Sequence, residues 1–293
     1  RTGDRPADVA ITPDRSKAVI ANLDSTFTTI VSLPSGAVTT VPTGTRQSQV
    51  EISPDGRYAY VGVLSGGDGV WRIDLNTNTV AGPKIATVDM GSVGYAYQQT
   101  HAMKLSPDGS VLAVAGAFTR PGVSLIDTAT WSFITDVAVP VGSLVTELAF
   151  SPDGSRIYAA ARDTDSVLEI SNAGASSAVL RTFAVGDFPW QLAVTPDASK
   201  LFVINFNNRN VGVVDLASGT QVATIPLSTN PSQSPNGLAL AGGKLHVAHG
   251  LSQVTSGGTV GLRFTQDGEV TVIDAATNAV LERIDTDRAP ASI

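Results

Sequence analysis

A short turn sequence, Ser/Thr-Pro-Asp, recurs along the chain and constrains its fold more than any other feature. The copies begin at Thr12, Ser53, Ser106, Ser151 and Thr195, and a degenerate sixth copy is Ala241-Gly242-Gly243. The prolines of successive copies lie 41, 53, 45 and 44 residues apart. Proline presets φ at the first central position of a turn and Asp or Gly completes it, so each copy predicts a β-hairpin. A repeat of this period indicates a repetitive architecture.

The strands around each turn follow one layout. Leu148–Ala161 (LAFSPDGSRIYAAA) shows an apolar strand, the turn, and a second strand that contains Tyr158. A third strand often ends in an apolar residue followed by aspartate, at Asp74, Asp127, Asp215 and Asp274. A polar turn after that aspartate leads into a fourth strand. Four short strands in about 45 residues are typical of a propeller blade.

The number of repeats predicts an all-β chain that forms a six-bladed β-propeller of four-stranded antiparallel blades, as a single domain over residues 1–293. A seven-bladed propeller, or one derived from it, is the alternative. The C-terminal sequence Arg288–Ile293 (RAPASI) is similar to Arg5–Val9 (RPADV), as if a further unit began there. Either this tail closes the ring beside the first blade, or a blade is truncated.

Two stretches carry a family resemblance. Leu201–Asn205 (LFVIN), followed by Val211–Asp215, and Gly268–Ile284 (GEVTVIDAATNAVLERI) resemble the YVTN-repeat β-propeller family, and the likeness covers essentially the whole chain. That family includes surface-layer proteins, periplasmic binding proteins and propellers beside redox enzymes. The resemblance therefore implies a propeller fold and an exported protein, whereas it leaves the chemistry open.

Composition narrows the range of partners. A net charge of −7 and a pI near 4.9 disfavour a nucleic-acid partner. No apolar run approaches the ~20 residues that a membrane-spanning helix needs. The chain has no cysteine, which excludes disulfides and thiolate chemistry. It begins at Arg1 and has 14 Arg against 5 Lys, so we expect a secreted or periplasmic monomer from which a leader was removed.

Antiparallel pairing places the Pro-Asp turns at one end of every blade, which we call the turn end. The start of the first strand and the end of the second lie at the opposite end, the far end. The two long insertions, residues 89–100 and 250–266, fall at the far end. Loops lengthened on one side of a rigid scaffold commonly bind ligands, so we expect the functional surface there. A tolerated surface insertion is the alternative.

Two groups of residues at the far end are candidates for ligand contacts. Aligning the first strands places Asp8, Gln49, Glu147 and Gln191 in one polar ring along the channel wall. We predict ligand contacts for Asp8, Gln49 and Gln191, and water-bridged channel polarity is the alternative. The aromatic side chains Trp190, Tyr95 and Tyr97 are predicted to stack on a sugar or a ring compound. Packing of Trp190 under a neighbouring loop is the alternative to that role.

A second resemblance concerns metal binding. Pro235–Ala239 (PNGLA) is similar to the metal-ligand segment of six-bladed gluconolactonase-type hydrolases. The resemblance implies a divalent cation, Ca²⁺ or Mn²⁺, held by Asn236, Glu147 and His249 at the channel mouth. The acidic ligands that this family uses in other blades are not retained here. A lone histidine is also more often a hydrogen-bonded structural residue than a ligand.

Two functions follow from these residues. The leading hypothesis is an exported, non-catalytic binding module for a small molecule or a cell-surface partner. The rival hypothesis is a metal-dependent lactonase-type hydrolase or lyase, with His101 and Glu147 as the acid–base residues. No Gly-x-Ser-x-Gly, Walker or Rossmann signature with strand–helix context occurs in the chain.

Overall fold

The computed structural model describes residues 3–44, 46–64, 69–87, 102–116, 122–227, 234–256 and 259–286. Side chains are described throughout these ranges except in residues 251–256 and 259–267. Three predicted site residues, Tyr95, Tyr97 and His101, lie outside the described residues. Within the described ranges, no helix has the length and apolar character that crossing a membrane requires.

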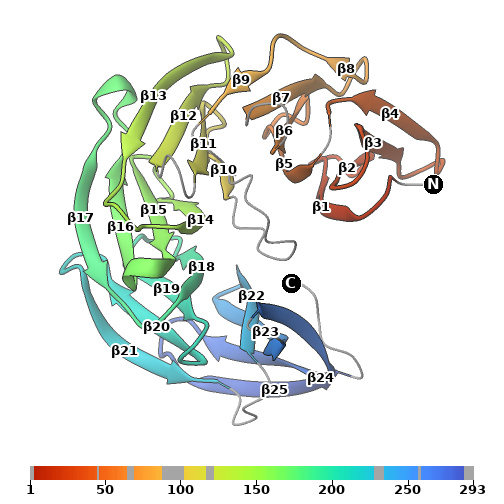
Figure 1. Ribbon diagram of the computed structural model, residues 1–293. Helices are drawn as coiled ribbons and strands as arrows, with labels where there is room; N and C mark the ends of the chain where they lie inside the picture. Colours follow the sequence, from red (N-terminus) through yellow and green to blue (C-terminus); the bar gives the residue numbers. More distant parts are fainter. Residues whose placement is uncertain are drawn as a thin grey trace. The chain divides into compact units, whose positions relative to one another are not determined.

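The described residues fold into six antiparallel sheets, which we call A to F in chain order (Figure 1). Sheet A contains β1 (Pro6–Ile11), β2 (Lys17–Asn22), β3 (Phe27–Ser32) and β4 (Val38–Pro42). Sheet B contains β5 (Gln47–Ile52), β6 (Tyr58–Val63), β7 (Gly69–Asp74), β8 (Thr79–Val80) and β9 (Ile85–Ala86). Sheet C contains β10 (Met103–Leu105), β11 (Val111–Gly116), β12 (Gly122–Asp127) and β13 (Ser132–Ala138).

The other three sheets repeat this layout. Sheet D contains β14 (Val145–Phe150), β15 (Arg156–Ala161), β16 (Ser166–Ser171) and β17 (Val179–Ala184). Sheet E contains β18 (Pro189–Val194), β19 (Lys200–Asn205), β20 (Asn210–Asp215) and β21 (Thr220–Pro226). Sheet F contains β22 (Ser234–Ala241), β23 (Lys244–Ser256), β24 (Thr259–Asp274) and β25 (Val280–Thr286). Two short 3₁₀ turns, η1 (Arg162–Thr164) and η2 (Gly174–Ser176), complete the regular structure of the described ranges.

Within each sheet the strands follow one another in chain order. In sheet B the fourth position is shared, because β8 and β9 both pair with β7. The all-β class and the four-strand layout are therefore confirmed. The number of blades stays a prediction, as does the single domain over residues 1–293.

The Ser/Thr-Pro-Asp turns owe their shape to one carboxylate each. In sheet D, Asp153 Oδ1 accepts hydrogen bonds from the Ser151 hydroxyl at 2.5 Å and the Ser155 N–H at 3.0 Å. The bond from Ser151 is the main reason that the pKa of Asp153 falls to about 2. Asp14, Asp55, Asp108 and Asp197 make equivalent bonds in their turns. The aspartate is thus a structural part of the hairpin, as expected of an Asx-type turn.

Apolar clusters lie between neighbouring sheets. The described residues divide into two compact units. The first contains sheets A to C, and the second contains sheet D from Thr146 onward together with sheets E and F. In the first unit, one cluster around Val61 joins sheets A and B, and another around Tyr60 joins sheets B and C. In the second unit, a cluster around Phe183 joins sheets D and E, and one around Phe202 joins sheets E and F.

One apolar position departs from the expected packing. The residue that follows the polar ring is buried in sheets B to E, at Val50, Met103, Leu148 and Leu192. Its equivalent in sheet A, Val9, is 57% exposed. In the first unit no described sheet precedes sheet A, so none of the described sheets of that unit covers this face of β1.

Candidate functional site

The polar ring of the first unit bonds to backbone. Asp8 Oδ2 of β1 accepts a hydrogen bond from the N–H of Val50 in β5, at 2.9 Å. Gln49 Oε1 of β5 accepts one from the N–H of Met103 in β10, at 2.5 Å. Each of these side chains therefore joins the first strand of one sheet to the first strand of the next. These bonds give Asp8 and Gln49 a structural role, and their predicted ligand contacts stay a prediction.

An ion pair lies deeper along the same strands. Lys104 Nζ of β10 lies 3.3 Å from Glu51 Oε1 of β5. Burial raises the pKa of the Glu51 carboxyl, and Lys104 opposes that shift. Because each charge has a partner, the pair stabilises the contact between sheets B and C.

The equivalent ring residues of the second unit behave differently. Glu147 Oε1 accepts a hydrogen bond from the N–H of Leu148, the next residue in its own strand, at 3.0 Å. Gln191 Oε1 is buried and has no hydrogen-bond partner in the described part of the chain. A buried amide oxygen without a donor is costly. The predicted ligand contact of Gln191 stays a prediction.

An aromatic wall stands at the far end of sheet E, immediately beside Gln191. We define it as Phe188, Trp190 and Phe206. The Phe188 and Trp190 rings stack with their centroids 5.9 Å apart and their planes 19° from parallel. Phe206 is buried and packs against both rings, at 5.5 and 5.9 Å. Phe188 and Trp190 are half-buried, so part of each ring faces solvent.

The backbone beneath Phe188 is a recurrent part of the scaffold. Phe188 has φ of 61°, and the residues at the same place before β1 and β5, Arg5 and Arg46, have φ of 48° and 59°. In sheet E the Phe188 N–H donates to Asp165 Oδ1 at 3.0 Å, and the Phe188 carbonyl accepts from Phe206 N–H at 2.9 Å. The left-handed conformation is therefore shared, whereas the aromatic side chain belongs to sheet E alone among these three sheets.

A guanidinium group completes the wall. Arg162, in η1 at the end of β15, lies with its central carbon 4.8 Å from the Phe188 ring centroid. It is buried, and its Nε donates to Asp163 Oδ1 at 2.6 Å. A guanidinium over an aromatic face is attractive, so Arg162 helps to fix the orientation of Phe188.

His249, predicted as a metal ligand, is fully buried at the far end of β23. Its Nε2 lies 3.0 Å from Thr271 Oγ1, and Thr271 in turn donates to Glu269 Oε1 at 2.8 Å. Burial lowers the pKa of His249 to about 4, so the imidazole is neutral at pH 7. Its Nδ1 is buried without a partner among the described residues.

The role of His249 is clear from the sheets that carry asparagine at the same place. In sheet A, Asn22 Nδ2 donates to Thr29 Oγ1 at 3.0 Å. Thr29 occupies the position in β3 that Thr271 occupies in β24, since each faces the residue two before the asparagine or histidine. His249 therefore makes the contact between the second and third strands that asparagine makes in sheet A.

The predicted metal site finds no support in this geometry. Within the described ranges, no group of three or more His, Cys, Asp or Glu side chains is placed to hold a metal ion. Asn236 lies in a bulge of β22 beside His249, whereas Glu147 lies in β14 of another sheet. The predicted metal role of Asn236, Glu147 and His249, and the catalytic role of His101 with Glu147, stay predictions.

Comparison with known proteins places the chain in a family. Residues 15–238 match the family model described as the cytochrome D1 heme domain. The chain belongs to this family. A seven-bladed β-propeller protein of Mycobacterium tuberculosis is 29% identical over 143 residues, which cover 47% of this chain and 34% of that protein. The match thus spans about a third of that relative.

Solved structures share the fold. Kuenenia stuttgartiensis hydrazine synthase aligns with a TM-score of 0.73 and 20% identity, over 98% of this chain and 88% of that one. A functionally unknown protein from Desulfotomaculum acetoxidans aligns with a TM-score of 0.66 and 16% identity, over 95% and 85%. The dihydro-heme d1 dehydrogenase NirN, in complex with DHE, aligns with a TM-score of 0.59 and 13% identity, over 96% and 66%. Together with the family match, these alignments support a β-propeller, whereas the YVTN-repeat family specifically stays a prediction.

The heme in the family's description can be tested against the described residues. A heme offers a wide aromatic plane, and its iron takes a ligand such as histidine. The exposed faces of Phe188 and Trp190 fit the plane. His249 does not fit the iron, because its side chain is fully buried: Nε2 is engaged with Thr271, and Nδ1 is enclosed within the protein. His246 lies near the turn end of β23, away from the wall at the far end of sheet E.

Proposed function

We propose that this chain is a non-catalytic, ligand-binding propeller module that stacks a flat ring compound of the heme type on the aromatic wall of sheet E. The observation that carries the proposal is the stacked, half-buried pair Phe188 and Trp190. At the position of Phe188, sheets A and B carry Arg5 and Arg46. At the position of Trp190, they carry Ala7 and Ser48. The family match and the complex of NirN with DHE support a heme-type ring as the ligand class.

Each part of the wall has a definite contribution to such binding. A ring face laid on Phe188 or Trp190 gains about 0.5–1.5 kcal/mol beyond area burial. Phe206 and Arg162 keep the Phe188 ring in place before the ligand arrives, so little side-chain entropy is lost on binding.

The experiment is a titration of the full chain with metal-free protoporphyrin IX, followed by the porphyrin absorption band. Phe188→Arg and Trp190→Thr replace each aromatic with the residue type that other sheets carry there, so the scaffold tolerates both changes. We expect each variant to weaken binding about tenfold, and Trp71→Ala, a half-buried tryptophan of sheet B, to leave it unchanged. Equal affinity in all four proteins would refute the proposal.

Iron separates ring stacking from metal ligation. Because His249 is engaged inside the protein, we expect hemin and metal-free protoporphyrin IX to bind within about threefold of each other. A strong preference for hemin would instead require an iron ligand outside the described residues, and His101 is the predicted site residue that lies there. An exported location and a monomeric state belong to the same proposal.

A further inference from the structure

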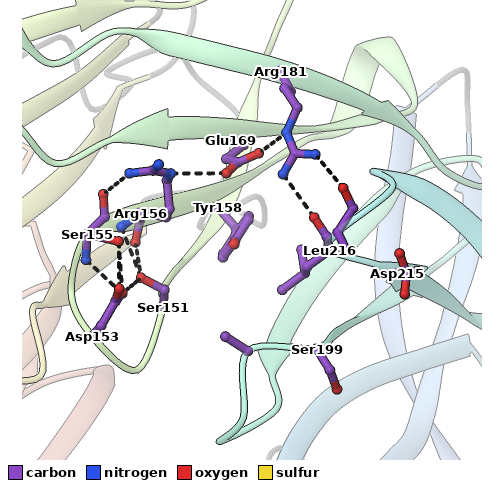
Figure 2. Close-up of a pocket in the computed structure, with 12 residues that line it drawn as sticks. Ser151, Asp153, Ser155, Arg156, Tyr158, Glu169, Arg181, Ser199, Asp215 and Leu216 are labelled. Atoms are coloured by element: carbon purple, nitrogen blue, oxygen red, sulfur yellow. Dashed lines mark hydrogen bonds and ion pairs between the residues drawn. The ribbon is translucent and has the colours of Figure 1, made fainter.

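A second cleft opens at the turn end of sheets D and E, in the same unit as the aromatic wall but at the opposite end of sheet E. Its volume is ≈ 350 Å³. Figure 2 shows Tyr158 between two sides of the cleft, with Glu169 and Arg156 on one side and Arg181 and Leu216 on the other. A cleft of this size accommodates a small organic molecule.

The turn that follows β20, near the cleft, carries glycine where its counterpart in sheet C carries a bulky residue. Four residues after the aspartate that ends the third strand, sheet C has Trp131 and sheet E has Gly219, both with positive φ. Trp131 stacks on Tyr60 of the preceding sheet at 5.7 Å and fills the space between the two sheets. A Cβ on Gly219 would lie 2.9 Å from the buried Phe183, whose ring centroid lies 6.5 Å from that of Tyr158, so Phe183 takes the place beside this tyrosine that Trp131 takes beside Tyr60.

The cations that line the cleft are already neutralised. Glu169 is almost fully buried, and it forms ion pairs with Arg156 Nε at 3.2 Å and with Arg181 Nε. Arg181 also donates to the carbonyls of Leu216 and Ala217, at 2.9 and 3.2 Å. All three donor nitrogens of Arg181 are thereby engaged, so this wall is poorly suited to hold an anion.

Two acceptors of the cleft remain open. Asp215 Oδ1 accepts from the N–H and the hydroxyl of Ser218, both at 2.7 Å, and these bonds lower the pKa of the carboxyl so that it is ionised. No charged group among the described residues pairs with the Asp215 carboxylate. Tyr158 has a relative exposure of 4%. Its hydroxyl makes no hydrogen bond to a described residue.

In sheet B, the carboxylate at the same position forms an ion pair with an arginine. There Asp74 is the equivalent of Asp215, and Arg57 Nε lies 3.5 Å from Asp74 Oδ2. The same guanidinium lies 4.8 Å from the Tyr58 ring centroid. Sheet E has Ser199 in the place of Arg57, and the backbone match is direct: Leu75 N–H donates to Arg57 O as Leu216 N–H donates to Ser199 O.

We propose that the cleft binds a small organic cation, with a guanidinium or primary ammonium group on the Asp215 carboxylate and against Tyr158. The cation takes the place that the Arg57 guanidinium takes beside Asp74. A carboxylate without an internal counter-ion, a tyrosine hydroxyl without a partner among the described residues and an aromatic ring are the three groups that recognise such a cation. This inference does not depend on the proposed function, since it concerns the other end of sheet E.

Agmatine, which carries both cationic groups, is the probe, and calorimetry with the full chain is the measurement. We expect a Kd of about 1 mM or tighter, with neither butanol nor butyrate binding. Asp215→Asn keeps the Oδ1 acceptor for Ser218, so the turn folds, and it should weaken agmatine binding about tenfold or more. The matched control is Asp74→Asn, which should leave the affinity unchanged because Asp74 is paired with Arg57.

A second variant tests the site without removing the carboxylate. Ser199→Arg supplies sheet E with the guanidinium that sheet B has, and it should abolish agmatine binding while the fold is retained. The inference is overturned if the wild-type chain does not bind agmatine, if butyrate binds as well as agmatine, or if Asp215→Asn and Ser199→Arg both bind with wild-type affinity.

Discussion

The space between sheets B and C and the space between sheets D and E are formed by equivalent strands, but different side chains fill them. Trp131 fills the first, stacked on Tyr60 and donating from its indole Nε1 to Pro83 O at 2.8 Å. Gly219 stands at the same place in the second, where Phe183 packs on Tyr158 instead, and a cleft lined by Glu169 and Asp215 lies beside this tyrosine. The two spaces therefore differ in the aromatic side chain that packs on the tyrosine.

The polar contacts across the two spaces are alike. Arg72 of sheet B donates to Thr128 O at 3.0 Å, and Arg181 of sheet D donates to Leu216 O at 2.9 Å. Both carbonyls belong to the residue directly after the aspartate that ends a third strand. The cation across the boundary is thus part of the scaffold, and the difference between the two spaces lies in the apolar filling.

The largest expected effect comes from emptying the filled space. Trp131→Gly removes a side chain that is 6% exposed, together with its stack on Tyr60 and its bond to Pro83, and should destabilise the protein by about 4 kcal/mol. Denaturant unfolding measures this change. As a control, Trp71→Ala, at a half-buried tryptophan of sheet B, should cost far less. A loss below about 1 kcal/mol in Trp131→Gly would show that the indole is not what holds sheets B and C together.

Acid should destabilise the protein through the buried His249 of sheet F, whose place in sheet A is taken by Asn22, a residue that does not titrate. The pKa of His249 is lowered from 6.5 to about 4 by burial, so above pH 6.5 the imidazole is neutral in both folded and unfolded chains. As the pH falls from 6.5 to 4, the unfolded chain binds the proton first, and up to about 3 kcal/mol of stability is lost. Unfolding at a series of pH values measures this loss.

The control for this titration is His249→Asn. It restores the residue type of Asn22, whose amide bonds Thr29, and it should remove the stability loss between pH 6.5 and 4. An unchanged pH profile in the variant would mean that another group is responsible.

A smaller effect is expected for the buried carboxylate at the wall of the cleft. Glu169→Gln leaves Arg156 and Arg181 without their charge partner, and both guanidinium groups are partly exposed and regain water. We expect a destabilisation of about 2 kcal/mol, measured by denaturant unfolding. Glu282→Gln on exposed β25 serves as the control and should change stability by less than about 0.5 kcal/mol. Equal effects in the two variants would contradict the role assigned to Glu169.

The smallest expected effect tests the cross-sheet cations themselves. Lys200 Nζ of sheet E donates to Ala275 O and Ala276 O of sheet F, at 2.9 and 2.7 Å. Lys200→Met should cost about 1 kcal/mol, since the carbonyls are left to water. Lys244 begins β23 as Lys200 begins β19, but its Nζ makes no hydrogen bond to a described residue. Lys244→Met should therefore be neutral, and a cost equal to that of Lys200→Met would contradict the account.

The sequence predicts the scaffold well and the sites only in part. The Asp153 turn follows from local pattern, because its hydrogen bonds join neighbours in the chain, whereas Trp131 packs on Tyr60 and bonds Pro83, which are distant in the sequence. The cleft could not be predicted, because Ser199 looks like an ordinary turn residue until the structure shows that it lines the cleft together with Tyr158 and Asp215. Alignment places Phe188 and Trp190 at the far end, but the buried Phe206 that supports them is recognised only in the structure.

The central claim, that the wall of sheet E binds a ring compound while the space between sheets B and C is closed, can be tested in one NMR titration. The chain has three tryptophans, and each gives its own indole N–H signal. On addition of metal-free protoporphyrin IX, we predict that the Trp190 signal, assigned with Trp190→Thr, shifts strongly and the Trp131 signal does not move. A titration in which Trp190 stays in place, or in which Trp131 moves as much, would contradict the account.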